Sequence, residues 1–264
     1  MKKILFFFVI LTTLFSCSND DNNTNPDKVL QKVVFYKNSS NEKHWIITNN
    51  LLTTITNADG SLAEEFVYDA QSRVISDVKY SNGAVTETTT ITYNIDNTIQ
   101  SIDNLPYTFN AATRTYTYSY SGTFTINCQV NTDFLAENFV RTGTNAGEYR
   151  MTYLNGDMTS FEKLTSSSTD VLKNFHFDAG FGSNPMYSAI LAVAKVKSLT
   201  DPSFFIDCQV SKNMANGFDK GSTDPYYYNY GIVSSPRFLS IGTEVLDSSN
   251  NFVGFYSFAD YYYQ

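Results

Sequence analysis

Histidine, cysteine and clustered basic residues are scarce in this chain, and each shortage excludes a class of function. The 264 residues include 2 histidines and 3 cysteines. His44 and His176 are far in sequence from each other and from Cys128 and Cys208, so no zinc-binding spacing exists. The net charge is −8 and no segment of the predicted mature chain concentrates lysine or arginine. Nucleic-acid binding, which needs clustered cations to neutralise phosphates, is therefore not expected.

Catalytic and cofactor motifs are also missing. The sequence holds no Gly-x-Ser-x-Gly, His-Glu-x-x-His or phosphate-binding loop. Asp59-Gly60 does not mark a calcium loop, because Ile55 and Phe66 occupy the first and twelfth positions, where ligands are required. Carboxylates are plentiful, but the adjacent Glu64-Glu65 should diverge to opposite faces of a strand, and no other pair stands out for glycoside hydrolysis. The sequence names no catalytic residue, metal site or cofactor, and it favours a non-enzymatic protein.

The one long apolar run lies at the N-terminus. Lys2 and Lys3 precede the segment 4–15, which only two threonines interrupt. A charged start and a short apolar core are typical of a secretory signal peptide, and the run is shorter than the about 20 residues that span a bilayer. We predict a signal peptide over residues 1–16; an uncleaved anchor or a buried helix is the alternative.

Leu14-Phe15-Ser16-Cys17 resembles a bacterial lipobox. The resemblance implies cleavage before Cys17 and lipidation of its thiol and new amino group, which anchors a protein stably in a membrane. Phe15 departs from the smaller residues that are usual at its position. The polar segment that follows cannot bury apolar surface, so residues 17–28 are predicted to be a lipidated, flexible tether.

The residues after Cys17 bear on which side of the membrane the protein faces. Ser18, Asn19, Asp20 and Asp21 resemble the surface-export signal of Bacteroidota lipoproteins. The resemblance implies a protein held in the outer membrane by its lipid and exposed to the medium. A plain spacer that leaves the domain on the periplasmic face is the alternative, and the sequence leaves both open.

Residues 29–264 are predicted to form a single β-rich domain. Aromatic residues make up 16% of the chain, which is ample for a core. Residues 115–126 alternate in the manner of half-buried strands, with aromatic or aliphatic side chains on one parity and threonine or serine on the other, and Gly122 marks a turn. The pairs Asp59-Gly60, Asn82-Gly83 and Asn155-Gly156 predict two-residue hairpin turns.

One segment departs from this β pattern. Pro185 precedes a largely apolar stretch from Met186 to Lys197, which predicts one short helix that plugs or covers the sheet. A buried strand over residues 189–196 is the alternative.

Cys128 and Cys208 lie in matching contexts, Ile-Asn-Cys-Gln-Val and Ile-Asp-Cys-Gln-Val. Outside the cytoplasm the two thiols are free to pair, and the bond would close a loop of about 80 residues and stabilise the fold by roughly 4 kcal/mol. Two buried free thiols on equivalent strands, or a chance similarity of the two segments, are the alternatives.

An aromatic residue followed by Asp or Asn recurs along the chain, with the ring ending a strand and the Asx side chain bonding forward to start a turn. The pairs are Tyr68-Asp69, Tyr93-Asn94, Phe109-Asn110 and Phe177-Asp178. They resemble the degenerate tyrosine–aspartate hairpin repeats of RHS-like proteins. With the lipobox and Asn184-Pro185, they also resemble Bacteroidota lipoproteins of the DUF4595 type, over roughly residues 44–196. That resemblance implies a porin-like, all-β fold, an antiparallel up-and-down meander curling into a barrel or half-barrel, and transfers no catalytic residue.

Tyrosines gather near the C-terminus, at Tyr226, Tyr227, Tyr228 and Tyr230. Such amphipathic rings suit stacking on sugars or contact with a protein, although consecutive strand tyrosines also alternate between core and surface. The predicted function is therefore that of a lipid-anchored envelope or cell-surface lipoprotein, a structural or binding module for a glycan or protein ligand. A hydrolase of surface polysaccharide, with two convergent carboxylates, and a carrier of an apolar ligand, with an aliphatic lumen, are the alternatives.

Overall fold

The computed structural model describes most of the predicted β-domain. The described residues are 29–165, 169–176, 183–202, 204–207, 210–215, 217–219, 228–229, 231–235, 238–246 and 252–264. The predicted signal peptide and tether lie outside these ranges, as do Phe177-Asp178 and Cys208.

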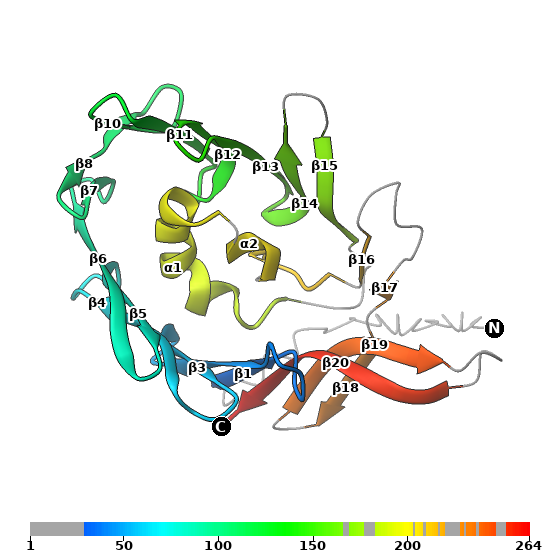
Figure 1. The fold of residues 1–264 in the computed structure, drawn as a ribbon. Helices are drawn as coiled ribbons and strands as arrows, with labels where there is room; N and C mark the ends of the chain where they lie inside the picture. Colours follow the sequence, from blue (N-terminus) through cyan, green and yellow to red (C-terminus); the bar gives the residue numbers. More distant parts are fainter. Residues whose placement is uncertain are drawn as a thin grey trace, which may run out of the picture.

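The described strands form two antiparallel sheets (Figure 1). The first has the order β18-β19-β20-β1-β2-β3-β4-β5-β6-β7-β8, and the second has the order β17-β16-β15-β14-β13-β12-β11-β10-β9. The strands of the first sheet are β1 (Leu30–Phe35), β2 (Lys43–Thr48), β3 (Leu51–Asn57), β4 (Leu62–Tyr68), β5 (Val74–Ser81), β6 (Ala84–Tyr93), β7 (Ile99–Ile102), β8 (Leu105–Pro106), β18 (Gly231–Ser235), β19 (Phe238–Leu246) and β20 (Phe252–Tyr263). Those of the second are β9 (Thr108–Asn110), β10 (Thr115–Tyr120), β11 (Phe124–Val130), β12 (Ala136–Gly143), β13 (Gly147–Leu154), β14 (Asp157–Leu164), β15 (Thr169–His176), β16 (Gly217–Asp219) and β17 (Tyr228–Asn229).

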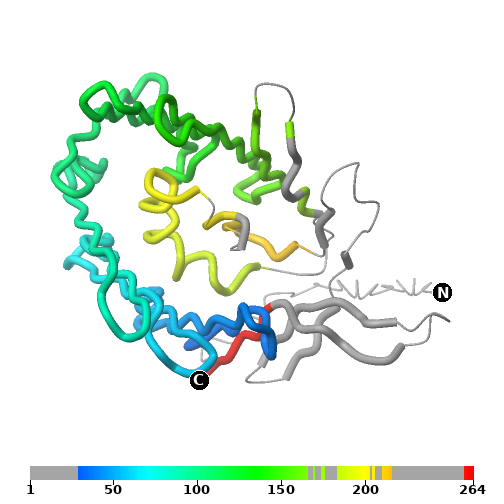
Figure 2. The backbone as a smooth tube through the Cα atoms, in the orientation of Figure 1, coloured from blue at the N-terminus to red at the C-terminus, as the bar shows by residue number. Residues whose placement is uncertain are grey.

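Most neighbouring strands are also consecutive in the chain, which is the predicted up-and-down arrangement. The exception is β20, which pairs antiparallel with β1 through registers such as Val33 with Tyr261. The last strand therefore lies beside the first, as the red and blue segments of Figure 2 show. Together the two sheets curl into an open ring, so the antiparallel meander is confirmed in its half-barrel form.

The predicted helix lies inside this ring (Figure 1). It is α1 (Tyr187–Thr200), which begins two residues after Pro185, and the alternative of a strand over 189–196 is wrong. Its buried positions are almost all apolar, as in a helix surrounded by protein: Ala189, Ile190, Val193, Ala194, Val196 and Leu199. A second helix, α2 (Phe204–Asp207), was not predicted, because four residues are too few to show a helical period.

Two of the three Asx-Gly pairs form the predicted two-residue turns. Asn82 and Gly83 join β5 to β6 with φ values of 51° and 76°, and Asn155-Gly156 joins β13 to β14 in the same way. The prediction for Asp59-Gly60 is wrong in length, because β3 and β4 are separated by four residues. There the Asp59 carboxylate accepts hydrogen bonds from Ser61, which favours the wider turn.

Asp69 and Asn110 start turns as expected, because each side chain accepts hydrogen bonds from the backbone of the following residues, whereas the Asn94 side chain donates to the Thr98 hydroxyl instead. The Asp69 carboxylate accepts hydrogen bonds from the backbone N–H groups of Gln71 and Arg73, and the Tyr68 hydroxyl donates to the carbonyl of Leu52 in the preceding hairpin. Asn131 forms the same turn toward Leu135 without an aromatic residue before it, so the sequence pattern missed it. The repeated unit is therefore the Asx turn, and its side chains line one rim of the ring.

Candidate functional site

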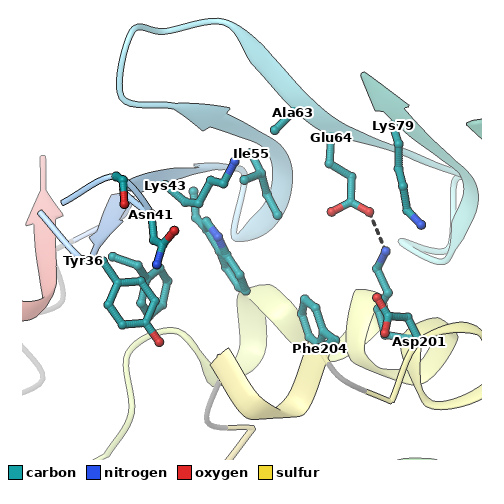
Figure 3. Close-up of a pocket in the computed structure, with 13 residues that line it drawn as sticks. Tyr36, Asn41, Lys43, Ile55, Ala63, Glu64, Lys79, Asp201 and Phe204 are labelled. Atoms are coloured by element: carbon teal, nitrogen blue, oxygen red, sulfur yellow. Dashed lines mark hydrogen bonds and ion pairs between the residues drawn. The ribbon is translucent and has the colours of Figure 1, made fainter. Parts of the chain in front are cut away.

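A cavity of about 650 Å³ lies between the sheet and the two helices, and we name it the Glu64 cavity (Figure 3). Strands β1 to β5 and the β1–β2 loop supply one side, with Tyr36, Asn41 and Glu64 among the lining residues. Asp201 and Phe204 lie opposite them, at the ends of α1 and α2. The volume falls within the range of 300–1,000 Å³ that is typical of small-molecule sites.

An aromatic cluster forms the apolar wall of the Glu64 cavity. The rings of Trp45 and Phe204 are stacked, with centroids 5.5 Å apart and planes inclined by 17°. Phe35 packs against Trp45 at 4.9 Å. All three rings line the cavity; Phe35 and Trp45 are buried in the core, and Phe204 is the least buried of the three.

A buried charge cluster forms the polar wall. The Lys197 ammonium, on α1, donates hydrogen bonds to Glu64 on β4 at 2.5 Å and to Asp77 on β5 at 2.7 Å. The side chains of Lys197 and Asp77 are only 3% and 4% exposed, and that of Glu64 is 14% exposed. One cation therefore faces two carboxylates in a region of low dielectric. Of the three residues, Glu64 and Lys197 line the cavity and Asp77 does not.

The environment shifts the pKa values of this cluster. Burial raises the pKa of Glu64 to about 7; the Lys197 ammonium acts against this rise, and the Asp77 carboxylate adds to it. Burial acts to lower the pKa of Lys197, but the two carboxylates outweigh it and the pKa is raised. Lys197 therefore stays protonated, and Glu64 is the group that exchanges its proton near neutral pH.

The raised pKa of Glu64 predicts a pH-dependent stability. A carboxyl whose folded-state pKa is about 7 instead of 4.5 adds stability that is fully present below pH 4.5 and is lost as the pH rises through 7. Glu64→Gln, which mimics the protonated acid, is expected to reduce the fall in unfolding free energy between pH 5 and pH 8 by roughly 1–3 kcal/mol. Urea unfolding at both pH values measures this, with the exposed Glu87→Gln as the control. Equal pH dependence in wild type and Glu64→Gln would contradict the prediction.

Further polar groups surround the opening of the Glu64 cavity. Lys79 lines it and pairs with the exposed Glu87 at 3.0 Å, and Lys43 lines it and donates a hydrogen bond to the Asn57 side chain. Asn41 is an exposed residue of the lining. The cavity thus offers donors and acceptors of both charge signs beside an aromatic wall.

Of the predicted ligand-stacking tyrosines, Tyr226, Tyr227 and Tyr230 lie outside the described residues. Tyr228 belongs to strand β17 and is not among the described residues that line the Glu64 cavity. Cys17 also lies outside the described residues. The lining residues were missed because none belongs to a known motif.

Cys128 is a buried free thiol on β11, and its Sγ lies 3.4 Å from the carbonyl oxygen of Ser198 on α1. Its predicted partner, Cys208, is outside the described residues. The idea of equivalent strands is wrong, because Ile206 and Asp207 belong to α2 while the matching residues before Cys128 belong to β11. The similar flanking sequences therefore do not reflect similar structure.

The two alternative functions find different support in the fold. Glu64 and Asp77 converge, but both bind the same ammonium, and Asp77 does not line the cavity, so they are not the two separated acids of a glycosidase. Side chains of α1 and α2, including the fully buried Ile190 and Phe205, pack in the described interior. The lining of the Glu64 cavity beside them is mainly a mixture of charged, polar and aromatic residues, which does not support an aliphatic lumen for an apolar cargo.

In the part of the chain that the structure describes, no three side chains of His, Cys, Asp or Glu are grouped as a metal site would require. Neither described helix has the length and apolar character needed to cross a membrane.

Comparisons with known proteins give structural neighbours only. The chain matches no protein-family model and no curated protein. Among solved structures it is similar to a porin-like protein from Bacteroides uniformis, with 9% identity over 90% of this chain and 96% of that chain and a TM-score of 0.36. It is also similar to a porin-like protein from Bacteroides vulgatus, with 7% identity over 73% of this chain and 98% of that chain and a TM-score of 0.27. Both of these structural neighbours are porin-like proteins of Bacteroides, and at these identities and TM-scores neither assigns a function to this chain.

Proposed function

We propose that this chain is a lipid-anchored envelope lipoprotein of the DUF4595 type, and that its β-domain is a binding module for a glycan fragment. The observation that carries the binding proposal is the Glu64 cavity, which combines an aromatic wall with polar groups around an open volume of about 650 Å³. The lipobox at Cys17 supports the anchor, and the acidic residues after it support exposure at the cell surface in preference to the periplasmic face.

A sugar suits this chemistry better than a strongly charged or purely apolar ligand. Sugar rings present C–H faces that pack on aromatic side chains, here Phe204 and Tyr36. Their hydroxyls both donate and accept hydrogen bonds, which matches Asn41, Lys79 and Glu64. Lysines and carboxylates occur together in the lining, so neither charge sign dominates, and a neutral polar ligand is favoured.

A glycan array tests this proposal directly. The full lipidated protein, held in nanodiscs, is expected to bind one class of glycan above the signal of empty nanodiscs. Lys79→Gln removes a cavity donor and a weak surface ion pair, so it should reduce affinity at least tenfold with little effect on stability. Lys163→Gln, an exposed lysine on β14, is the matched control and should bind as wild type does.

Two results would contradict the binding proposal. One is the absence of any glycan that binds above empty nanodiscs. The other is a glycan whose affinity survives both Lys79→Gln and Asn41→Ala, since that ligand would bind elsewhere on the molecule.

A hydrolase is the second candidate, and the pKa of Glu64 near 7 is the observation that favours it. A general acid works best with such a pKa, and Glu64 lines the cavity with Asp201. New reducing ends released from the bound glycan, and lost in Glu64→Gln, would support hydrolysis. An intact glycan after long incubation would leave binding as the function.

A further inference from the structure

A second cavity, of about 440 Å³, lies on the other side of α1, and we name it the Lys195 cavity. It is bounded by the Asx turns at the rim of the ring, which contribute Arg73, Asn97 and Phe134. It shares no lining residue with the Glu64 cavity, so its chemistry is independent of the function proposed above.

One face of α1 forms the helical wall of the Lys195 cavity. Ser188, Leu191, Ala192 and Lys195 line it, and their spacing of three, one and three residues places them along a single stripe. This stripe is less buried than the opposite face of the helix, which packs into the core. Lys195 therefore extends from a helix that is fixed by its other face.

The charge of the Lys195 cavity has one sign. Arg73 and Lys195 are among the lining residues, and no Asp or Glu is among them. Arg73 is held in place, because its guanidinium bonds to Asp69 at 2.7 Å and to Asn97 at 2.9 Å and lies 4.6 Å from the centre of the Tyr93 ring. Since Asp69 neutralises Arg73 in part, Lys195 contributes most of the uncompensated charge.

Lys195 is half-buried and makes no ion pair with any described residue. Its ammonium lies 5.9 Å from the centre of the Phe134 ring. Burial lowers the pKa of Lys195, and the charge of Asp133 opposes this only in part. An anion in the cavity would supply the counter-charge that the protein leaves out.

The rest of the lining is suited to a flat or apolar body. The rings of Tyr93, Tyr116 and Phe134 line the cavity together with Leu191. The hydroxyl of Tyr116 accepts a hydrogen bond from the backbone of Ile99, which fixes this ring in the wall. A ligand that fits must therefore combine a negative group with a ring or an apolar surface.

We propose that the Lys195 cavity binds a small organic carboxylate with a ring-shaped or apolar body. The carboxylate pairs with the Lys195 ammonium, and Arg73 adds positive potential at the rim. The body of the ligand packs between the side chain of Leu191 on α1 and the aromatic rings of the lining, which are those of Tyr93, Tyr116 and Phe134.

Calorimetric titration of the full lipidated protein in nanodiscs tests this, with empty nanodiscs as the reference. The probes are benzoate, 2-naphthoate and biphenyl-4-carboxylate, each compared with its neutral amide. We expect at least one carboxylate to bind, and to bind tenfold or more tightly than its amide. Lys195→Gln should lower the affinity for that carboxylate tenfold and remove the preference over the amide.

Two further variants keep the test decisive. Lys163→Gln removes an exposed lysine on β14 that does not line the Lys195 cavity, so it should leave the affinity unchanged. Lys195→Arg keeps the charge and should retain binding, which separates loss of charge from loss of folding. The proposal is overturned if no carboxylate binds, if carboxylate and amide bind equally, or if Lys195→Gln binds as wild type does.

Discussion

Replacing Lys197 by methionine is expected to lower the free energy of unfolding by about 3–5 kcal/mol. Lys197 is the shared partner of Glu64 and Asp77, and all three side chains are largely removed from water. Without the ammonium, two carboxylates remain close together in a region of low dielectric. The Oδ1 atom of Asp77 already lacks a hydrogen-bond partner, so it offers no second hydrogen bond that could compensate for the loss of the Lys197 ammonium.

The loss should appear as a fall of roughly 10 °C in Tm, since each kcal/mol shifts a domain of this size by about 2–4 °C. Because Glu64 is protonated below pH 7, the cost should be smaller at pH 5 than at pH 8. Urea unfolding at the two pH values measures both effects. Lys195→Met is the matched control: it removes a half-buried lysine without an ion pair among the described residues, so the cost should stay below about 1 kcal/mol.

A compensating variant separates the charge effect from a packing effect. Buried ion pairs replaced as a set by apolar residues of similar size are often neutral or stabilising. Lys197→Met combined with Glu64→Met and Asp77→Leu should therefore recover most of the stability that Lys197→Met loses. A single variant as stable as wild type, or a triple variant no better than the single one, would show that the three charges do not form the predicted cluster.

Cys17→Ala is expected to abolish lipidation altogether. The lipobox resemblance makes the Cys17 thiol the point of attachment of the first lipid, and alanine has no thiol. The variant should remain as the precursor with residues 1–16 attached, incorporate no labelled palmitate and disappear from the outer-membrane fraction. Mass spectrometry of the N-terminal peptide and fractionation of Bacteroidota cells measure these changes.

Ser18→Ala is the control for Cys17→Ala, because it alters the adjacent residue and leaves the thiol in place. It should be cleaved and acylated as wild type is. Wild-type cleavage and an unchanged outer-membrane fraction in Cys17→Ala would remove the lipid anchor from the proposed function. Protease treatment of intact cells then distinguishes the cell surface from the periplasmic face.

Local signals in the sequence predicted the elements well, because turns and helices depend on neighbouring residues. Asn82-Gly83 forms its hairpin since both positions accept positive φ, and Asp69 starts its turn with its own carboxylate. The divergence of Glu64 and Glu65 was also predicted correctly: Glu64 bonds to Lys197, and Glu65 accepts a hydrogen bond from Tyr80.

The two cavities were beyond prediction, because each joins residues that are far apart in the chain. Lys197 meets Glu64 and Asp77 across 133 and 120 positions, and only the register of the curled sheet sets these contacts. One signal was available in hindsight. Lys195 and Lys197 are the two charges of an otherwise largely apolar helical stretch, and a lysine that is fully buried in such a stretch usually has a charged partner.

The position of α1 inside the ring underlies both proposed sites, and a thiol cross-link tests it most directly. The side chains of Asn50, in the β2–β3 turn, and Ser188, on α1, are exposed and hydrogen-bonded at 3.1 Å. In Asn50→Cys/Ser188→Cys, dibromobimane, which becomes fluorescent only when it bridges two thiols, should join positions 50 and 188, as peptide mapping by mass spectrometry would show. Fluorescence no higher than that of either single variant, with no 50–188 peptide, would contradict this placement of the helix.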